Sequence, residues 1–394
     1  MNSEWTQSFQ GLRHYVEQEA FRGWDPFDGL NSRLFRSIPL LKNNKWARLA
    51  WLQFHKRSPI NFRPLTGVPK VYNAKGLALF VLGYAQIHRR YPSDETATRI
   101  QNLADQLLKM ATPGYAGPAW GYPFDWQARA FFQPKGTPTV VATSFVAEAL
   151  LAAYDLLGKA DYLDTAVAAA RFVLHDLNRT YDDNGDFTFS YSPLDRTQVF
   201  NAGLLGAKTL ALIYERTGEQ RLIDEARQVV RFVAKHQHPD GAWSYGTLPY
   251  HQWIDNFHTG YNLEAMAIYR RASGDRDFDE VFRKGMDYYL SRFWTSEGMP
   301  RYYHDRLYPI DLHAPAQLLA TLHKSGLSHQ HQELIRRVLD WTIRHMQSPK
   351  GYFYYQKRPL YTNKIPYMRW TQAWMFYGMA YHLYGGRVRQ FKNT

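Results

Sequence analysis

Residues that could bind and transform a polar substrate recur in a few short segments of this sequence. Each segment combines carboxylates or imidazoles with guanidiniums and large aromatic side chains. This mixture suits sugars, because their C–H faces stack on aromatic rings while their hydroxyl groups need polar partners. The candidates for substrate binding are Asp125, Trp126, Arg129, Asp195, Trp253, Arg301, Tyr302, His313, Arg369 and Trp370. The candidates for catalysis are Asp255, Asp311, His258 and Tyr303.

Two of the candidates could cleave a glycosidic bond. If Asp255 and Asp311 face each other across a substrate, they would act as general acid and general base. Glycosidic hydrolysis is therefore the reaction that we expect first. A structural role is the alternative for both residues, because an aspartate directly before a helix is commonly its N-cap.

A second reaction fits the other candidates. An acidic sugar would be held by Arg301 or Arg369, whose guanidinium forks match a carboxylate. With its charge neutralised, such a uronate could lose its α-proton to Tyr303 or His258, which would make the protein a lyase or an epimerase. Histidines near helix starts are also commonly hydrogen-bonded wall residues, so a structural alternative stands here too.

An internal repeat of about sixty residues indicates which elements position these side chains. The segment Tyr154-Asp-Leu-Leu-Gly158 matches Tyr214-Glu-Arg-Thr-Gly218, and at the same offset Arg171-Phe-Val173 matches Arg231-Phe-Val233. The spacing of apolar residues within each unit is helical, so each unit is predicted to be a helical hairpin. Glycines expected at helix C-caps, where a positive φ is needed, are Gly158, Gly218, Gly274 and Gly326.

Six hairpins fit the chain, and the sequence predicts an all-α fold, an (α/α)6 toroid with long aromatic loops at one mouth. The hairpins are expected to begin near Val71, Val140, Asn201, Thr259, Leu312 and Thr371. The last has no room for an outer helix, which the N-terminal helix around residues 7–21 would supply. An open solenoid is the alternative, but solenoids rarely carry such long connections.

The toroid is expected to be a single domain over residues 1–394, in which residues 1–70 close the ring and residues 71–394 form the repeats. Because all inner helices start from the same end, the candidate residues just before them should line one mouth. Loops at such a mouth are where function is expected.

Composition narrows the class of protein. The 394 residues include 12 Trp, 28 Tyr and 23 Phe, which is too much buriable surface for a disordered chain. The most apolar stretch, residues 140–157, is interrupted by polar and charged side chains, so we expect no transmembrane segment. The absence of cysteine excludes disulfides, thiolate nucleophiles and Cys-bound metal centres. Dinucleotide, phosphate-loop and zinc-helix motifs are absent too, and we expect no cofactor and no metal.

The formal net charge of +13 favours an anionic partner. The lysines and arginines are scattered, without the runs of like charge that mark nucleic-acid-binding tails, so no nucleic acid is expected. Arginines among the candidate residues make an anionic oligo- or polysaccharide the favoured partner, with peripheral contact to a membrane surface left open. The N-terminus carries no secretion signal, so a cytoplasmic location is expected.

The sequence resembles the six-hairpin (α/α)6-toroid glycosidase superfamily over its whole length, by architecture. Three motifs are similar to those of proteins from bacterial polysaccharide-biosynthesis clusters. They are Trp24-Asp-Pro-Phe-Asp-Gly-Leu-Asn-Ser32, Asp255-Asn-Phe-His-Thr-Gly-Tyr-Asn-Leu-Glu264 and Met368-Arg-Trp-Thr-Gln-Ala-Trp374. This resemblance implies a role in making or trimming a surface glycan.

Two further similarities are partial. Asp311-Leu-His313 followed by Gln317-Leu318 is similar to a stretch in the helical domain of glucuronyl epimerases, whose upstream β-rich domain has no counterpart here. Gln237-His-Pro-Asp-Gly241-Ala-Trp243 is similar to the Gln-to-Trp repeat of terpenoid cyclases, whose acid and diphosphate motifs are missing.

The sequence therefore predicts an enzyme of surface polysaccharide metabolism that acts on a uronate-containing glycan, with hydrolysis by an Asp pair as the leading reaction. The alternatives are a uronate lyase or epimerase that uses Tyr, His and Arg, a non-catalytic glycan-binding protein, and a toroid of the terpenoid-cyclase type.

Overall fold

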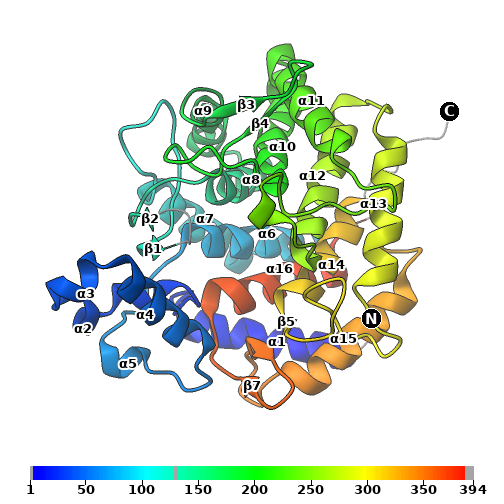
Figure 1. Cartoon of the computed structure of the whole chain (residues 1–394). Helices are drawn as coiled ribbons and strands as arrows, with labels where there is room; N and C mark the ends of the chain where they lie inside the picture. The colour runs from blue at the N-terminus through cyan, green and yellow to red at the C-terminus, as the bar shows by residue number, and fades with distance from the viewer. Residues whose placement is uncertain (1–2, 128–131, 387–394) are drawn as a thin grey trace.

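The helices form two concentric layers (Figure 1), in a computed structural model that describes residues 3–127 and 132–386. The inner layer consists of α6 (Ala74–Arg90), α8 (Val140–Leu157), α10 (Phe200–Thr217), α12 (Asn256–Ser273), α14 (His313–Lys324) and α16 (Trp374–Tyr384). The outer layer consists of α7 (Asp94–Lys109), α9 (Ala160–His175), α11 (Gln220–Lys235), α13 (Asp279–Arg292), α15 (Gln332–Met346) and α1 (Ser3–Gln18). This arrangement confirms the predicted six-hairpin toroid.

The difference between the layers follows from the distribution of apolar residues. The inner helix α8 is mostly apolar, with Glu148 as a buried exception. It is long and apolar enough to cross a membrane, yet 78% of it is buried inside the protein. The outer helix α11 instead buries one stripe, which includes Leu222, Val229 and Val233, and presents charged residues on the other face. Burial of each such apolar side chain stabilises the fold by about 1.5–3 kcal/mol. The inner helices are therefore stabilised on most of their surface, and the outer helices along one apolar stripe.

The N-terminal helix packs where the ring closes. Consecutive inner helices contact one another all the way round, and α16 contacts both α14 and α6. Helix α1 packs on α16 and α15 as the sixth outer helix. Trp5 Nε1 donates a hydrogen bond to Asp340 Oδ1 at 2.8 Å, and Ser8 Oγ donates to Gln347 Oε1 at 2.6 Å. The two ends of the chain therefore hold each other in place.

Glycines end the inner helices where the repeat predicts them. Gly158, Gly218 and Gly274 are left-handed C-caps with φ of 68°, 68° and 71°. Gly326, at φ 73°, comes one residue after Ser325, which is the C-cap of α14. The turn glycine Gly241 has a second constraint, because a Cβ atom there would lie 2.2 Å from the Lys284 carbonyl oxygen.

Four buried charges connect the inner helices around the axis of the ring. Glu148 on α8, Lys208 on α10, Glu264 on α12 and Lys324 on α14 alternate in sign. Lys208 Nζ lies 2.9 Å from Glu148 and 3.4 Å from Glu264, and Lys324 Nζ lies 2.9 Å from Glu264 and also contacts Glu148. Each charge therefore has two partners of opposite sign, which buried charges require. We call these four residues the charge ring.

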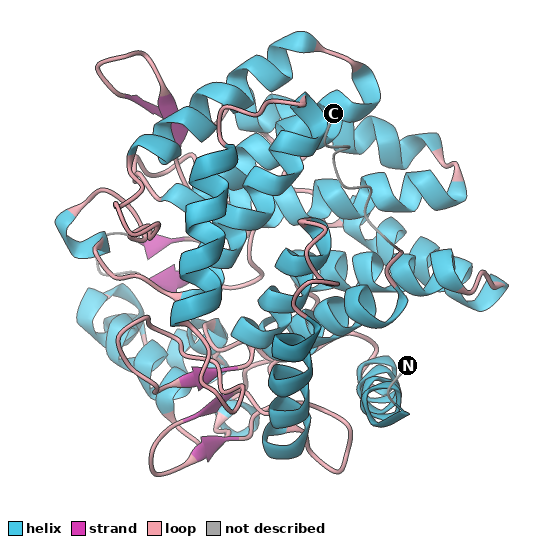
Figure 2. Ribbon diagram, turned by 90° about the vertical axis from the view of Figure 1, so that its right-hand side faces the viewer, coloured by secondary structure: helices cyan, strands magenta, loops and turns pink. Residues whose placement is uncertain are grey.

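The loops carry short antiparallel strands, all of which lie toward one side of the molecule in Figure 2. Two hairpins are β1 (Trp126–Gln127) with β2 (Phe132–Gln133), and β3 (Arg179–Tyr181) with β4 (Phe187–Phe189). The third sheet has the order β5 (Ile310–Asp311), β6 (Gln356–Lys357), β7 (Thr362–Asn363), with Asp311 opposite Gln356. On the same side lie η2 (Pro249–His251) and η3 (Met368–Ala373), a π-helical turn that leads into α16.

A helical segment between α1 and α6 projects from the ring at the lower left of Figure 1. It comprises η1 (Asp28–Asn31), α2 (Arg33–Arg36), α3 (Pro39–Asn43), α4 (Lys45–Arg57) and α5 (Arg63–Thr66). Its own small core is formed by Leu30, Phe35 and Leu52.

The charge ring makes a prediction about stability. Lys208→Met should destabilise the fold by about 3–5 kcal/mol, because two buried glutamates then share a single lysine. Adding Glu148→Gln should recover part of that loss, since Lys324 and Glu264 remain as a matched pair. Urea unfolding would measure both changes. The control is Arg283→Met, which removes an exposed ion pair with Glu280 and should change stability little. Equal effects of Lys208→Met and Arg283→Met would contradict a role for the charge ring.

Candidate functional site

Two connected cavities open at the predicted mouth. The inner pocket measures about 250 Å3 and the outer cleft about 1400 Å3. The aromatic residues that line both are Phe27, Trp126, Tyr191, Tyr245, Trp253 and Tyr303. First-turn residues of five inner helices also line the inner pocket: Lys75 of α6, Val141 of α8, Asn201 of α10, His258 of α12 and His313 of α14. Helix α4 forms a wall of the outer cleft through Lys45, Trp46 and Lys56.

Asp255 and His258 form a hydrogen-bonded pair at the start of α12. Asp255 is the N-cap of this helix, and its Oδ1 accepts from the His258 backbone N–H at 3.0 Å. Its Oδ2 lies 2.7 Å from His258 Nδ1 and accepts from Trp253 Nε1 at 3.1 Å. The carboxylate therefore places the imidazole proton on Nδ1, which leaves the lone pair on Nε2. Within the described residues that nitrogen has no hydrogen-bond partner, and His258 lines the pocket. Asp255 thus has the N-cap role that was the alternative for it, and it also orients the His258 imidazole toward the pocket.

His313 is the same tautomer as His258, but its other ring nitrogen is the one without a partner. Lys75 Nζ donates to Tyr261 Oη at 2.9 Å, and Tyr261 Oη lies 2.7 Å from His313 Nε2. Because the lysine donates to the phenol, the phenol proton is directed at Nε2, and the imidazole proton lies on Nδ1. Among the described residues this buried Nδ1 has no partner. Burial, followed by the charge of Lys75, holds the pKa of His313 well below its usual range, so the ring is neutral.

The aromatic packing fixes both imidazoles. The ring of Phe257 stacks on His313 with centroids 4.4 Å apart and lies 4.3 Å from the ring of His258. The other face of His313 lies 4.1 Å from Trp374. Neither imidazole can turn without displacing a buried aromatic side chain, so the two rings are held in a defined relation.

Arg369 lies in the pocket wall beside these groups, but its fork is occupied. Its Nε and Nη2 donate to the two carboxylate oxygens of Asp25 at 2.5 and 2.8 Å, and the guanidinium lies over the rings of Tyr122 and Trp370. Within the described residues Nη1 has no hydrogen-bond partner. Arg369 therefore keeps one free N–H2 group for a ligand oxygen, whereas the sequence predicts a free fork that would bind a carboxylate.

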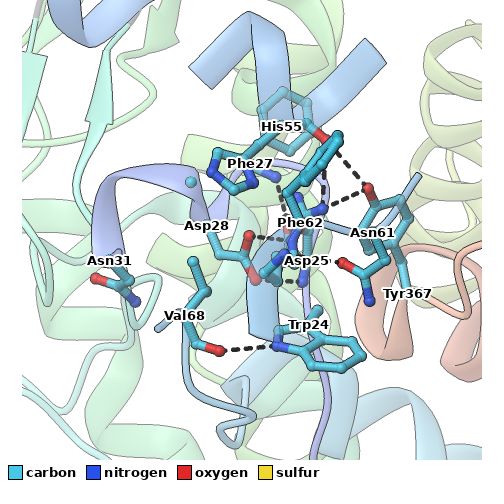
Figure 3. Close-up of polar contacts among 12 residues, drawn as sticks. Trp24, Asp25, Phe27, Asp28, Asn31, His55, Asn61, Phe62, Val68 and Tyr367 are labelled. Atoms are coloured by element: carbon cyan, nitrogen blue, oxygen red, sulfur yellow. Dashed lines mark hydrogen bonds and ion pairs between the residues drawn. The ribbon is translucent and has the colours of Figure 1, made fainter. Parts of the chain in front are cut away.

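The Trp24–Asp28 lead-in, shown in Figure 3, holds Asp25 in position. Asp28 Oδ1 accepts from Arg63 Nε at 2.6 Å, and Arg63 also donates to the Asp25 backbone oxygen at 2.8 Å. The same guanidinium donates to Tyr367 Oη at 2.8 Å, and Trp24 Nε1 donates to the Val68 oxygen at 2.9 Å. This network connects the lead-in to the sixth hairpin, and it supports the arginine in the pocket wall.

Asp311 is fully buried and does not line either cavity. Its carboxylate accepts from the His313 backbone N–H at 3.0 Å, from Trp370 Nε1 at 2.9 Å and from Gln356 Nε2 at 3.0 Å. Burial raises the pKa of Asp311 to about 6 in spite of these donors. The two predicted catalytic aspartates are thus both bound by donors, and Asp255 alone of the two lines the pocket.

The other candidates divide into wall residues and loop residues. Those that line the inner pocket are Trp126, Trp253, Tyr302, Tyr303, His313, Arg369 and Trp370. Burial raises the pKa of Tyr303, which favours its protonated form as a hydrogen-bond donor. Three candidates line neither cavity: Asp125 accepts from the Lys135 backbone, Asp195 from Ser192 and Thr197, and Arg301 donates to the Arg292 oxygen. Arg129 lies outside the described residues.

The sequence pattern did not identify several of the residues that line or support the pocket. Lys75 and Tyr261 are the most informative, since they set the protonation of His313. A signal existed for Lys75, which is the one lysine of α6 and lies two residues after the N-cap Asn73. Tyr261 belongs to the quoted motif that begins at Asp255, but its spacing suits core packing equally well. Among the described residues no group of His, Asp or Glu is arranged to hold a metal ion.

Comparisons with known proteins bear on the fold. No family model and no curated protein matches the chain. Among solved structures, an unsaturated glucuronyl hydrolase specific for heparin matches with a TM-score of 0.64 at 10% identity, over 97% of each chain. The fold is the (α/α)6 toroid. A cellobiose 2-epimerase from Bacillus thermoamylovorans matches this toroid at 0.63 and 9% identity, over 80% of this chain and 90% of that one. A D-mannose isomerase matches at 0.59 and 12% identity, over 78% and 85%.

The buried carboxyl of Asp311 makes a prediction about pH. Its folded pKa of about 6 is above the usual 3.8, so its stabilising contribution is full below about pH 4 and is lost as the pH rises through 6. Relative to Asp311→Asn, the wild type should lose up to about 3 kcal/mol between pH 4 and pH 7, at about 1.4 kcal/mol per pKa unit. Urea unfolding at several pH values would measure this difference. Asp164→Asn, at an exposed position, is the control. A difference that does not change with pH would overturn the assignment.

Proposed function

We propose that the protein is a carbohydrate-processing enzyme that moves a proton at a carbon next to a carbonyl or carboxyl group, as an epimerase or isomerase does. The observation that carries this proposal is the pair of imidazoles in one pocket whose free ring nitrogens are complementary, since one offers a lone pair and the other an N–H. His258 presents a free lone pair on Nε2, oriented by Asp255, and His313 is neutral with a proton on Nδ1. A base and a donor fixed on one aromatic-walled pocket suit proton abstraction and return.

The cationic side of the pocket suits the intermediate of such a reaction. Loss of the proton at carbon places negative charge on the neighbouring oxygen, and preorganised donors stabilise it. Arg369 offers its unpaired N–H2 group, and Lys75 lies behind Tyr261. In this scheme His258 Nε2 takes the proton from carbon and holds it, and the N–H of His313 stabilises the developing oxyanion together with Arg369. Transfer of that proton from His258 to the neighbouring carbon completes an isomerisation. Protonation of the opposite face of the same carbon by water completes an epimerisation, with the first proton released from His258 to solvent.

The dimensions suit one sugar unit in the inner pocket, with the remainder of the glycan in the outer cleft. Aromatic faces line both spaces, as C–H stacking to sugars requires. We include in the proposal the finer expectations from the sequence: a uronate-containing glycan, a role in surface polysaccharide metabolism and a cytoplasmic location. The free N–H2 of Arg369 and the net charge of +13 support the acidic substrate.

Hydrolysis is the second candidate, and two observations favour it. The glucuronyl hydrolase matches the chain over nearly its whole length, and the pKa of Asp311 is raised to about 6, as a general acid requires. Asp311 is, however, buried behind Trp370 and His313 and does not line the pocket. For this reason we rank hydrolysis second. A protein that only binds a glycan would need neither the free lone pair of His258 nor the free N–H of His313.

Solvent-isotope incorporation separates these reactions. Incubation in D2O with a panel of reducing sugars and uronate oligosaccharides should put deuterium on the carbon next to the carbonyl or carboxyl of one substrate, as read by mass spectrometry. His258→Gln and His313→Gln should each lower the rate at least about 100-fold, the usual contribution of a general acid or base.

The control is His304→Gln, a histidine of the neighbouring loop that is bonded to Tyr288 and lines neither cavity; it should keep the rate. Release of new reducing ends without deuterium on carbon, abolished by Asp311→Asn, would instead establish hydrolysis. Binding of a glycan with no change in it would refute an enzymatic function.

A further inference from the structure

The positive charge of the protein has one source in the sequence. Of the 48 lysines and arginines, 12 lie in residues 29–93, a stretch without a single aspartate or glutamate. The remaining 36 nearly balance the 35 acidic residues, so this stretch carries almost all of the net charge of +13. The lysines and arginines of this stretch are not all consecutive. The stretch is basic because it has no aspartate or glutamate to balance them.

The same stretch exposes large apolar side chains. In α2, α3 and the start of α4, Leu40 is 85% exposed, Trp46 74% and Leu34 50%. Ile38 and Leu41 are exposed as well, and helix α3 has no buried residue. An exposed apolar cluster of this kind marks an interaction site. We call the surface formed by Leu34, Ile38, Leu40, Leu41 and Trp46, with Arg33, Arg36, Lys42 and Lys45, the basic–apolar face.

Most of its cations are unneutralised. Arg36 contacts Asp125 at 3.4 Å, whereas Arg33, Lys42 and Lys45 have no acidic partner in the described part of the chain. The segment projects from the toroid in Figure 1, and the side chains of the basic–apolar face are exposed in the described part of the chain. The basic–apolar face thus joins apolar side chains that are free to insert with cations that are free to bind anions.

We propose that the basic–apolar face docks the protein on the surface of an anionic lipid bilayer. Leucine, isoleucine and tryptophan next to lysine and arginine form the side-chain set of interfacial membrane anchors, in which the apolar residues enter the headgroup boundary and the cations pair with anionic lipids. A second copy of the chain is disfavoured as the occupant, because a two-fold contact would place like charges against each other.

Docking in this way orients the active-site region. Trp46 and Lys45 belong to the basic–apolar face and also line the outer cleft. The entrance of that cleft would therefore lie beside the headgroups. The proposal concerns binding only and does not depend on the reaction proposed above.

Vesicle co-sedimentation with the full-length protein tests the proposal. The wild type should sediment with phosphatidylcholine vesicles that contain about one third phosphatidylglycerol, much less with pure phosphatidylcholine, and less at high salt. Lys42→Glu/Lys45→Glu should weaken binding by more than about tenfold, since each lost cation is worth about fivefold. Leu40→Glu/Leu41→Glu should weaken it similarly by removing the inserted residues.

Matched controls are Leu360→Glu, a leucine 96% exposed elsewhere on the surface, and Lys109→Glu/Lys350→Glu at two exposed lysines; both should bind as the wild type does. Circular dichroism would verify that all variants fold. The proposal is overturned if the wild type fails to bind the anionic vesicles at low salt, or if the control variants lose binding as strongly. It is also overturned if the leucine pair instead mediates a dimer in analytical ultracentrifugation and the vesicles remain unbound.

Discussion

The charge ring is the constraint on which the inner layer depends. Glu148, Lys208, Glu264 and Lys324 come from four successive inner helices, with separations of 60, 56 and 60 residues that repeat the hairpin length. Because a buried charge without a partner is very unfavourable, these helices can pack only in the one axial register that brings the four groups together. Apolar packing alone would tolerate a shift of one turn far more easily.

That register also determines the geometry of the pocket at the N-terminal ends of the inner helices. Glu264 lies on α12 less than two turns beyond His258, and it accepts a hydrogen bond from Gln317, one turn after His313 on α14, at 3.0 Å. A rise of about 1.5 Å per residue converts the fixed register of Glu264 and Gln317 into fixed heights for both histidines. The charge ring and the pocket belong to one set of rigid helices, so stability and site geometry are not separable here.

The sequence was a good guide to the position of residues along the helices and a poor guide to the direction of side chains. The sixty-residue repeat predicted the hairpins, the closing role of α1 and the mouth where Trp253, Asp255, His258 and His313 gather. Asp195 sits at an equivalent point of its repeat, yet its carboxylate satisfies the backbone of its own loop. Spacing alone cannot distinguish these cases, because an aspartate in a loop and one in a pocket have the same sequence context.

Arg369 illustrates the remaining limit. Its partner, Asp25, is 344 residues away in the chain, and no local pattern relates the two. The pairing exists because α1 closes the ring next to α16 and the lead-in then passes over the mouth, where Arg63 and Asp28 hold it. The lead-in therefore does more than complete the toroid. It turns an arginine that would otherwise bind any carboxylate into one with a single free amino group, so the closure of the ring itself restricts which oxygen of a ligand that arginine can meet.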